Sequence, residues 1–137
     1  MTYLLDTNVV SALRKPNRSA ALEQWLRSRP LTDMYLSAVT VGEIEKGIAA
    51  KRERDAVYAE ILRLWRDQTT SLFAGRILPF KLAEALRWGG LVQRQPDDEI
   101  DMIVAATALE HDLILVTLNV ADFRRVPGLR LENPLGP

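Results

Sequence analysis

Short apolar runs alternate with longer amphipathic stretches along this chain. Stretches with a helical spacing of apolar residues separate most of these runs. Parallel strands need helical crossovers of this length between them, so the pattern predicts an α/β fold with a mainly parallel sheet of about five strands. The runs with the length and composition of buried strands are Thr2–Leu5, Met34–Ser37, Arg76–Leu78, Leu113–Thr117 and Leu129–Leu131.

Two helices are predicted from apolar residues that share one helical face. The first carries Leu22, Trp25 and Leu26. The second carries apolar residues at positions i, i+4, i+7 and i+8, namely Val57, Ile61, Leu64 and Trp65. We expect all three tryptophans, which include Trp88, to lie in the core, although tryptophans at a helix surface would also suit a partner interface.

Two further helices are predicted later in the chain. One runs over residues 81–93 and contains Gly89-Gly90. Each glycine costs about 1 kcal/mol relative to alanine in a helix interior, which indicates close packing or a break at this point. The other begins at Asp97-Asp98 and ends near His111.

The composition narrows the classes of protein to which the chain belongs. Its 137 residues suit one domain that spans residues 1–137. The absence of cysteine excludes disulfides, thiolate nucleophiles and cysteine-bound zinc. Eighteen basic and eighteen acidic residues balance, so no overall basic charge attracts nucleic acid. Neither a signal peptide nor an apolar stretch of ~18 residues is present, and we expect a cytoplasmic protein with no membrane association.

Several chemistries are excluded by missing motifs. His111 is the only histidine, and its place at an expected helix C-terminus suits the helix dipole better than a role as a base. A histidine-based metal site would need a second histidine. No Gly-rich loop ends in Gly-Lys-Ser or Gly-Lys-Thr, as a P-loop would. No Gly-x-Ser-x-Gly elbow of a serine hydrolase is present either, and carboxylate chemistry remains.

Three carboxylates and one amide follow the expected strand ends. Asp6 follows the first strand, and Glu43 lies in the first turn after the second strand. Asp101 lies in the first turn of the long helix, and Asn119 lies just past the fourth strand. In a parallel sheet these positions meet at the carboxyl edge, where ligands bind in open α/β sheets. Oxygen ligands without histidine or cysteine suit Mg²⁺ or Mn²⁺.

Helix capping is the competing interpretation of the same residues. Thr40 and Glu43 have the spacing of a capping box, and the stretches 98–101 and 119–122 resemble looser versions of it. An acid in the first turn of a helix also gains about 0.3–1 kcal/mol from the dipole. Taken singly, Glu43 and Asp101 fit capping better than metal binding. Asp6 fits it least well, because a carboxylate at the end of a central strand is costly to bury without a partner or a cation. It would still suit the N-cap of the helix that follows.

Four segments together resemble the PIN-domain family, and within it the VapC-type, FitB-like toxins of bacterial toxin–antitoxin pairs. The segments match the family in order and spacing, and they cover nearly the whole chain. They are LLDTNVVSAL, SAVTVGEIEKGI, DEIDMIVAATALEHDLILVTLNVADF and LRLENP. The resemblance implies a three-layer α/β/α sandwich with a mainly parallel sheet.

The resemblance also implies an activity and a set of site residues. Members of this group are Mg²⁺- or Mn²⁺-dependent endoribonucleases that use a metal-activated water. Their three acidic positions fall on Asp6, Glu43 and Asp101 of this chain. The fourth position falls on Asn119, where many relatives carry aspartate. The resemblance implies that Asp6 and Asp101 bind the metal, and that Glu43 and Asn119 bind it directly or through water.

Further positions decide how complete such a site is. The supporting polar positions of the family fall on Thr7, Asn8 and Thr117. Asp98 and Asp122 are candidates for a further carboxylate. Leu118 stands where relatives often carry arginine, which removes a possible phosphate contact.

The resemblance implies several partners. They are RNA as the substrate, a cognate antitoxin protein and a second copy of the chain, with operator DNA bound only through the antitoxin. The antitoxin is expected in a groove flanked by helices around residues 22–26, 38–49 and 57–65.

Two rival classes stay open. A receiver-like phosphotransfer domain would be phosphorylated on Asp6, although Asn8 stands where such domains often have a second acid. A catalytically weak PIN domain would bind RNA or protein without cutting, an alternative suggested by Leu118 and Asn119.

Overall fold

The structure is a computed structural model that describes residues 1–136. Five strands form one sheet in the order β3-β2-β1-β4-β5, and every neighbouring pair is parallel. The predicted five-stranded parallel sheet is therefore confirmed. The strands are β1 (Tyr3–Leu5), β2 (Met34–Ser37), β3 (Ile77–Leu78), β4 (Ile114–Val116) and β5 (Leu131–Glu132).

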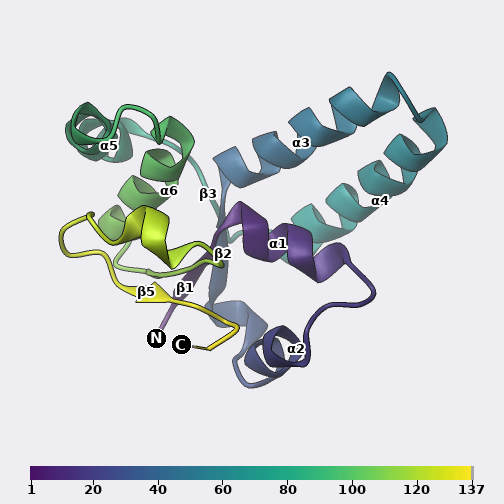
Figure 1. The fold of residues 1–137 in the computed structure, drawn as a ribbon, viewed down its shortest axis with the longest axis horizontal. Helices are drawn as coiled ribbons and strands as arrows, with labels where there is room; N and C mark the ends of the chain where they lie inside the picture. Colours follow the sequence, from purple (N-terminus) through teal and green to yellow (C-terminus); the bar gives the residue numbers. More distant parts are fainter. Residues whose placement is uncertain (137) are drawn as a thin grey trace.

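Helices connect the strands and cover the sheet. Two 3-10 helices, η1 (Leu31–Asp33) and η2 (Val120–Phe123), precede β2 and follow β4. Helices α3 and α4 form a hairpin that extends away from the sheet, and α5 and α6 pack together on the other side (Figure 1). The α-helices of the described residues are α1 (Thr7–Arg14), α2 (Ala20–Arg27), α3 (Ala38–Arg52), α4 (Ala56–Leu72), α5 (Leu82–Arg94) and α6 (Glu99–Glu110).

The apolar core has two parts, one on each face of the sheet. Tyr3 and Leu5 of β1 pack with residues of α1, α2, α3 and α4. Leu4, between them, packs with residues of α5, α6 and η2. Successive residues of a strand point to opposite faces, so both faces of the sheet are covered. The molecule is a three-layer α/β/α sandwich, as the family resemblance implies.

Most boundaries fall within one residue of the prediction, and two elements begin two residues later. The last strand spans Leu131–Glu132 and pairs with β4 through both residues, whereas residues 129–131 were expected. The long helix begins at Glu99 and not at Asp97-Asp98. The interpretation of Gly89-Gly90 is wrong, because α5 is continuous through both glycines. A β-carbon at either glycine would meet no atom within 4 Å, so neither glycine permits a close contact within the chain.

The three tryptophans differ in burial. Trp25 lies in the core as predicted, and its indole N–H donates to Oε2 of Glu132 over 2.6 Å. Trp65 and Trp88 are only half-buried, at the edges of the two cores. Trp88 packs edge-on against Phe80, with ring centroids 6.2 Å apart. Core positions for Trp65 and Trp88 are therefore confirmed only in part.

Three of the four residues of the predicted apolar stripe of α4 lie at the surface. Val57, Ile61 and Leu64 are 76%, 56% and 51% exposed, whereas Trp65 packs against the core together with Ala59 and Leu62. The helix is predicted correctly, but its buried face is rotated away from the predicted stripe. Val57, Ile61 and Leu64 are left uncovered within the chain.

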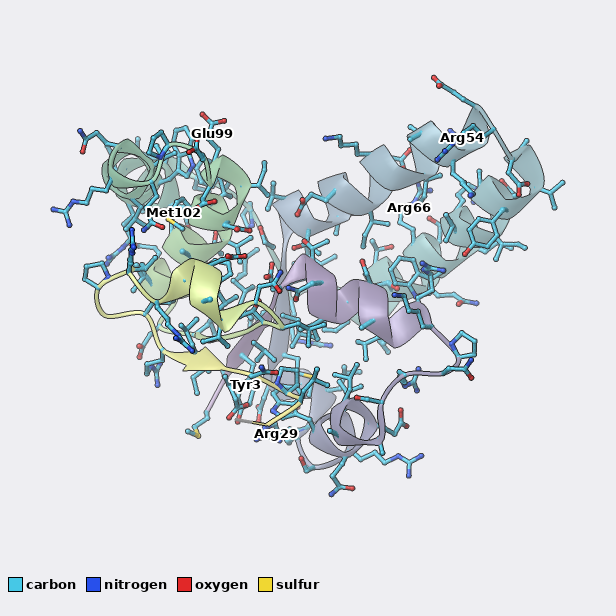
Figure 2. The ribbon with its side chains drawn as sticks, viewed as in Figure 1. Tyr3, Arg29, Arg54, Arg66, Glu99 and Met102 are labelled. Atoms are coloured by element: carbon cyan, nitrogen blue, oxygen red, sulfur yellow. The ribbon has the colours of Figure 1, made fainter. Side chains whose placement is uncertain are left out.

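Side chains of α2 and of the turn after it contact β1 and β5. The Arg29 guanidinium lies 4.4 Å from the ring centroid of Trp25 and 5.6 Å from that of Tyr3. It also pairs with Glu132 at 3.4 Å, and Figure 2 shows Arg29 and Tyr3 in the same part of the molecule. These contacts join the α2 region to β1 and β5.

His111 follows the last residue of α6, as predicted. Its Nε2 lies 2.9 Å from Oε1 of the buried Glu84, a partner that the sequence did not indicate. No helix of residues 1–136 is both long enough and apolar enough to cross a lipid bilayer.

Candidate functional site

Asp6 and Thr117 end adjacent strands at the point where the strand order reverses. From β1 the chain continues to β2 and β3 on one side, and it returns to β4 and β5 on the other. Asp6 follows β1, Thr117 follows β4, and the Asp6 N–H donates to the Val116 carbonyl over 2.9 Å. Ligands of open α/β sheets bind at such a switch point, outside the carboxyl ends of the strands. The topology therefore brings both residues to the expected ligand site.

The Thr117 hydroxyl orients the carboxylate of Asp6. It donates to Oδ2 of Asp6 over 2.9 Å. It accepts from the Asn8 side-chain amide over 3.2 Å and from the Asn119 backbone N–H over 3.0 Å. A hydroxyl has one donor and two acceptor positions, so these three bonds use all of them and direct its proton to Asp6. Asn8 also accepts from the Leu118 N–H over 3.2 Å, which fixes the chain just after β4.

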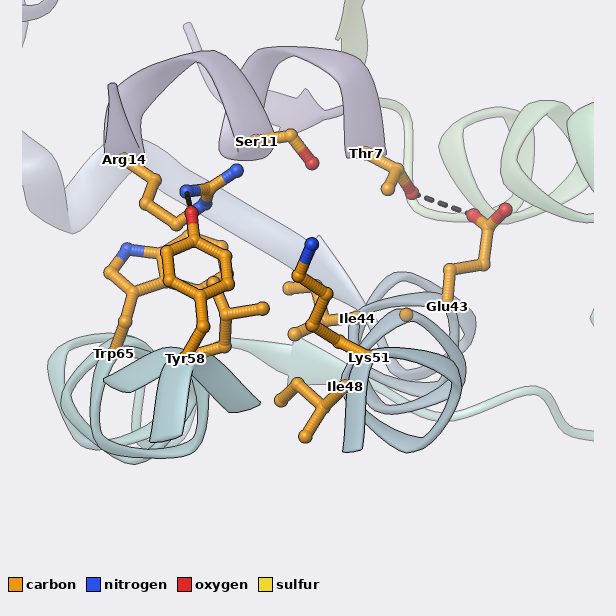
Figure 3. Close-up of a pocket in the computed structure, with 11 residues that line it drawn as sticks. Thr7, Ser11, Arg14, Glu43, Ile44, Ile48, Lys51, Tyr58 and Trp65 are labelled. Carbon is orange, nitrogen blue, oxygen red and sulfur yellow. Dashed lines mark hydrogen bonds between the residues drawn. The ribbon is translucent and has the colours of Figure 1, made fainter. Parts of the chain in front are cut away.

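A second set of hydroxyls holds Glu43. The Thr7 hydroxyl donates to Oε1 of Glu43 over 2.7 Å (Figure 3). The fully buried Thr40 hydroxyl lies 3.0 Å from that of Thr7. Because the single hydroxyl proton of Thr7 is directed to Glu43, Thr40 must donate to Thr7. Glu43 is therefore tied through Thr7 to the start of α1, next to Asp6.

The sequence-based assignment of Thr40 and Glu43 to a capping box is wrong. Helix α3 begins at Ala38, and the Ser37 side chain caps it by accepting from the Val39 N–H over 3.1 Å. Thr40 and Glu43 lie inside the helix, and Glu43 is in its second turn, not its first. Their three-residue spacing places them on one helix face, which was the available signal that both side chains turn toward Thr7.

Asp6 and Asp101 both have raised pKa values. Burial raises the pKa of Asp6 above its usual range, against the lowering effect of the bonds from Thr117 and from the Thr7 N–H. Asp101 lies in the first turn of α6, as predicted. Burial and then the charge of Asp6 raise the pKa of Asp101 to about 6. The hydrogen bonds to Asp6 therefore do not offset the cost of burying its charge.

Further acids act on the same pair. The carboxylates of Asp122, Asp98 and Glu43 add, in this order, to the rise in the pKa of Asp101. The charge of Asp122 also raises the pKa of Asp6. Both candidates for a further carboxylate therefore lie within electrostatic range of Asp101.

Asn119 and Leu118 contribute backbone and packing contacts. Asn119 is exposed at the start of η2, and its N–H binds Thr117. Neither the Asn119 nor the Asp98 side chain makes a capping hydrogen bond, so these two predicted caps do not form. Leu118 is half-buried against the first core. Asp6, in contrast, caps α1 by accepting from the Thr7 N–H over 2.8 Å.

The donor set has the chemistry of a site for a hard divalent cation. All its side-chain donors are oxygens, and carboxylates that raise one another's pKa values are stabilised as anions by a cation. The acids are not drawn around one point, however. Within residues 1–136, no three His, Cys, Asp or Glu side chains are close enough together to hold a metal ion. A bound ion would have to draw these side chains in or reach some of them through water.

Comparison with known proteins agrees with this geometry. The model of the PIN domain matches residues 3–129. The VapC ribonuclease Y4jK of Sinorhizobium fredii is 30% identical over 98% of this chain and 98% of its own. In the crystal structure of FitAcB from Neisseria gonorrhoeae, one chain is 32% identical, with a TM-score of 0.84 over 97% of this chain and 98% of that one. A chain of a toxin–antitoxin complex from Klebsiella pneumoniae is 25% identical, with a TM-score of 0.70 over 99% and 100%. The chain therefore belongs to the PIN-domain family, in its VapC-type branch.

Proposed function

We propose that this protein is a Mg²⁺- or Mn²⁺-dependent endoribonuclease and the toxin of a type II toxin–antitoxin pair. The observation that carries the proposal is that Asp6 ends β1 at the switch point of the sheet. Glu43 is tied to the start of α1 through Thr7, and the charge of Asp6 acts on Asp101 in the first turn of α6. The name of the relative Y4jK, a VapC ribonuclease, supports the reaction. The proposed site residues are Asp6, Glu43, Asp101 and Asn119, with Thr7, Asn8, Thr117, Asp98 and Asp122 in supporting positions.

Asp6 and Asp101 are the residues that would hold the metal ion directly. Their raised pKa values indicate negative charge that the chain does not offset. Glu43 and Asn119 would bind it directly or through water. Asp122 and Asp98 supply additional negative charge, so the neutral Asn119 does not leave the site short of acids.

Each residue of the site then has a defined task in hydrolysis. When bound, the metal supplies a water of lowered pKa and offsets negative charge on the phosphoryl oxygens. Thr117 keeps the carboxylate of Asp6 turned toward the site, and Thr7 does the same for Glu43. No histidine is needed as a base in this arrangement. His111, which is bound to Glu84, lies at the opposite end of α6 from Asp101.

Two protein partners follow from this proposal. A cognate antitoxin is supported by the similarity to a chain of a toxin–antitoxin complex, and operator DNA would be bound only through it. Helix α2 is one of the helices expected to flank the antitoxin groove, but its residues Leu22 and Trp25 pack in the core. The open surface is therefore that of α3 and α4, with Val57, Ile61 and Leu64 exposed.

A homodimer is the second proposed assembly. Leu82 and Leu86 of α5 are 75% and 71% exposed, which supports burial of this helix face against another copy. An RNA substrate would place the protein in the cytoplasm.

Induction in cells followed by sequencing of RNA ends tests the activity. We expect new RNA ends at defined positions with the natural sequence and none with Asp6→Ala, provided that both proteins remain folded. Purified protein should produce the same ends on total RNA with Mg²⁺ or Mn²⁺ but not with EDTA. RNA that is bound with metal but never cut would instead identify a binding module.

A further inference from the structure

A cavity opens beside the acidic site, between α1 and the α3–α4 hairpin. Its volume is about 230 Å³, and Thr7 and Glu43 line the end next to the site. Ile48 and Trp65 are among the apolar side chains that line it, and Figure 3 shows these groups facing the same space. A ligand in the cavity would therefore be continuous with a ligand at Asp6 and Asp101.

Two cations line the other end of this cavity without a carboxylate partner. Arg14 donates to the Tyr58 hydroxyl over 2.8 Å, and its guanidinium lies 5.9 Å from the ring centroid of Trp65. The ammonium of Lys51 lies 5.2 Å from the ring centroid of Tyr58. None of the ion pairs between described residues includes Arg14 or Lys51, whereas Arg63 and Arg66 of the neighbouring α4 have acidic partners. Aromatic rings hold a cation in place without neutralising it, so both charges stay available for an anion.

The opposite side of the site is negatively charged. A second cavity at the start of α6 is lined by Asp97, Asp98, Glu99 and Asp101. Figure 2 shows Glu99 on the α6 side, across the molecule from the α3–α4 hairpin. A polyanion held at the acidic site would be repelled by these carboxylates and attracted by Arg14 and Lys51. The charge distribution therefore defines the direction in which an RNA strand leaves the site.

We propose that the cavity between α1 and the α3–α4 hairpin binds the RNA nucleotide next to the scissile phosphate. Its phosphate contacts Arg14 and Lys51, and its base lies against the apolar and aromatic wall formed by Ile48, Tyr58 and Trp65. The inference rests on the proposed ribonuclease function. Every nucleotide carries a phosphate, whereas a peptide would need an acidic side chain at this one position, so RNA fits the two free cations better. The small volume and the aromatic lining suit an unpaired nucleotide, since bases are read by stacking in single strands.

The salt dependence of RNA binding tests this inference. The probe is a fluorescein-labelled, single-stranded RNA 12-mer of random sequence, measured by anisotropy in Mg²⁺ over a range of KCl concentrations. All proteins carry Asp101→Asn so that cleavage does not proceed. We expect Arg14→Gln and Lys51→Gln each to weaken binding about five- to tenfold at low salt, and each to reduce the salt slope by ~0.7, the value of one phosphate contact on a single strand. Arg130→Gln changes an exposed arginine that pairs with Asp112 beyond the end of α6 remote from Asp101; it serves as the matched control and should change neither quantity.

The outcomes separate this inference from the function on which it rests. The inference is overturned if both variants bind RNA with the affinity and the salt slope of the Asp101→Asn parent. It is also overturned if the parent itself shows no salt-dependent RNA binding. A loss of antitoxin binding in the variants without a loss of RNA binding would assign the cavity to the protein partner and also overturn it. The ribonuclease proposal fails on a different readout, the absence of metal-dependent RNA ends with the natural sequence.

Discussion

The Thr117 hydroxyl donates to the Asp6 carboxylate over 2.9 Å, from the end of the neighbouring strand. A buried carboxylate is usually paired with a cationic side chain, but the bonds to Asp6 come from a hydroxyl and a backbone N–H. Both are neutral donors, so they orient Asp6 and leave its charge for another cation. Burial raises the pKa of Asp6 despite these bonds, so a cation placed beside Asp6 would stabilise its ionised form.

Removing the Thr117 hydroxyl should weaken the site through Asp6. In Thr117→Val, the Asn8 amide and the Asn119 N–H lose their acceptor and Asp6 loses its donor. We expect RNA cleavage to fall by roughly 10–100-fold, as for other residues that orient a metal ligand. The free energy of unfolding should fall by about 1–3 kcal/mol, because buried polar groups lose their partners.

Thr117→Ser is the matched control for this variant. It keeps the hydroxyl and should retain most of the cleavage rate, measured together with urea unfolding of all three proteins. Equal losses in the serine and valine variants would contradict the proposed role of the hydroxyl, because only the valine variant lacks it.

Thr40 should affect cleavage although it contacts neither Asp6 nor Asp101 in the structure. Thr40→Val leaves the Thr7 hydroxyl without its donor and loosens Glu43 on α3. We expect a fall of roughly tenfold in kcat with little change in KM, because Thr40 itself does not line the cavity proposed for the substrate. Thr40→Ser should restore the rate. A change confined to thermal stability, with kcat intact in the valine variant, would contradict the proposed hydroxyl chain.

Stabilisation of the protein by Mn²⁺ or Mg²⁺ should increase with pH through about 6. The raised pKa of Asp101 means that the folded protein without metal binds more protons than the unfolded chain between about pH 4 and pH 6. Its stability should therefore fall as the pH rises through this window. Metal binding requires the ionised carboxylate, so the ion should stabilise the protein most above pH 6. Thermal melting with and without metal at pH 5 and pH 7.5 measures both effects, and a metal-induced shift that is equal at the two pH values would disagree with this account.

Glu84 should contribute stability at neutral pH that is lost in acid. Bonds from its own backbone N–H, from His111 and from the Lys81 N–H hold the pKa of Glu84 below its usual range, against its burial. A lowered pKa in the folded state stabilises the protein above about pH 4.5 and loses this effect as the pH falls through the folded value. Glu84→Gln should therefore cost about 1–2 kcal/mol at pH 7 and much less at pH 3. Chemical unfolding at the two pH values would show the difference, and a cost that does not depend on pH would refute the ionic contribution.

Much of the fold was predictable because strand-like and helix-like stretches alternate along the chain. The short runs at β1, β2 and β4 stand between amphipathic stretches, and a parallel sheet is the usual arrangement of such a pattern. The face of α4 could not be predicted in this way. Val57, Ile61 and Leu64 have the helical spacing of a buried face, yet the hairpin with α3 packs Ala59 and Leu62 against the core instead. Only the tertiary packing of the hairpin decides which face is covered.

The acidic positions were also predictable, but the contacts that support them were not. Asp6, Asp101 and the strand-end Thr117 follow from their places at the carboxyl edge of the sheet. The hydroxyl pair of Thr7 and Thr40 joins elements 33 residues apart, and no local pattern indicates such a pair. The spacing of Thr40 and Glu43 instead suggested a capping box, because a local rule and a tertiary contact can use the same residue types.

Isothermal titration of Mg²⁺ and Mn²⁺ into the purified protein tests the central claim most directly. The comparison is between Asp101→Asn, at the start of α6, and Asp112→Asn, an equivalent change just beyond the other end of that helix, where the side chain is 95% exposed. We predict that the natural sequence and Asp112→Asn bind the ion alike, whereas Asp101→Asn weakens binding at least tenfold. Equal metal affinities in all three proteins would contradict the assignment of the metal site to Asp6 and Asp101.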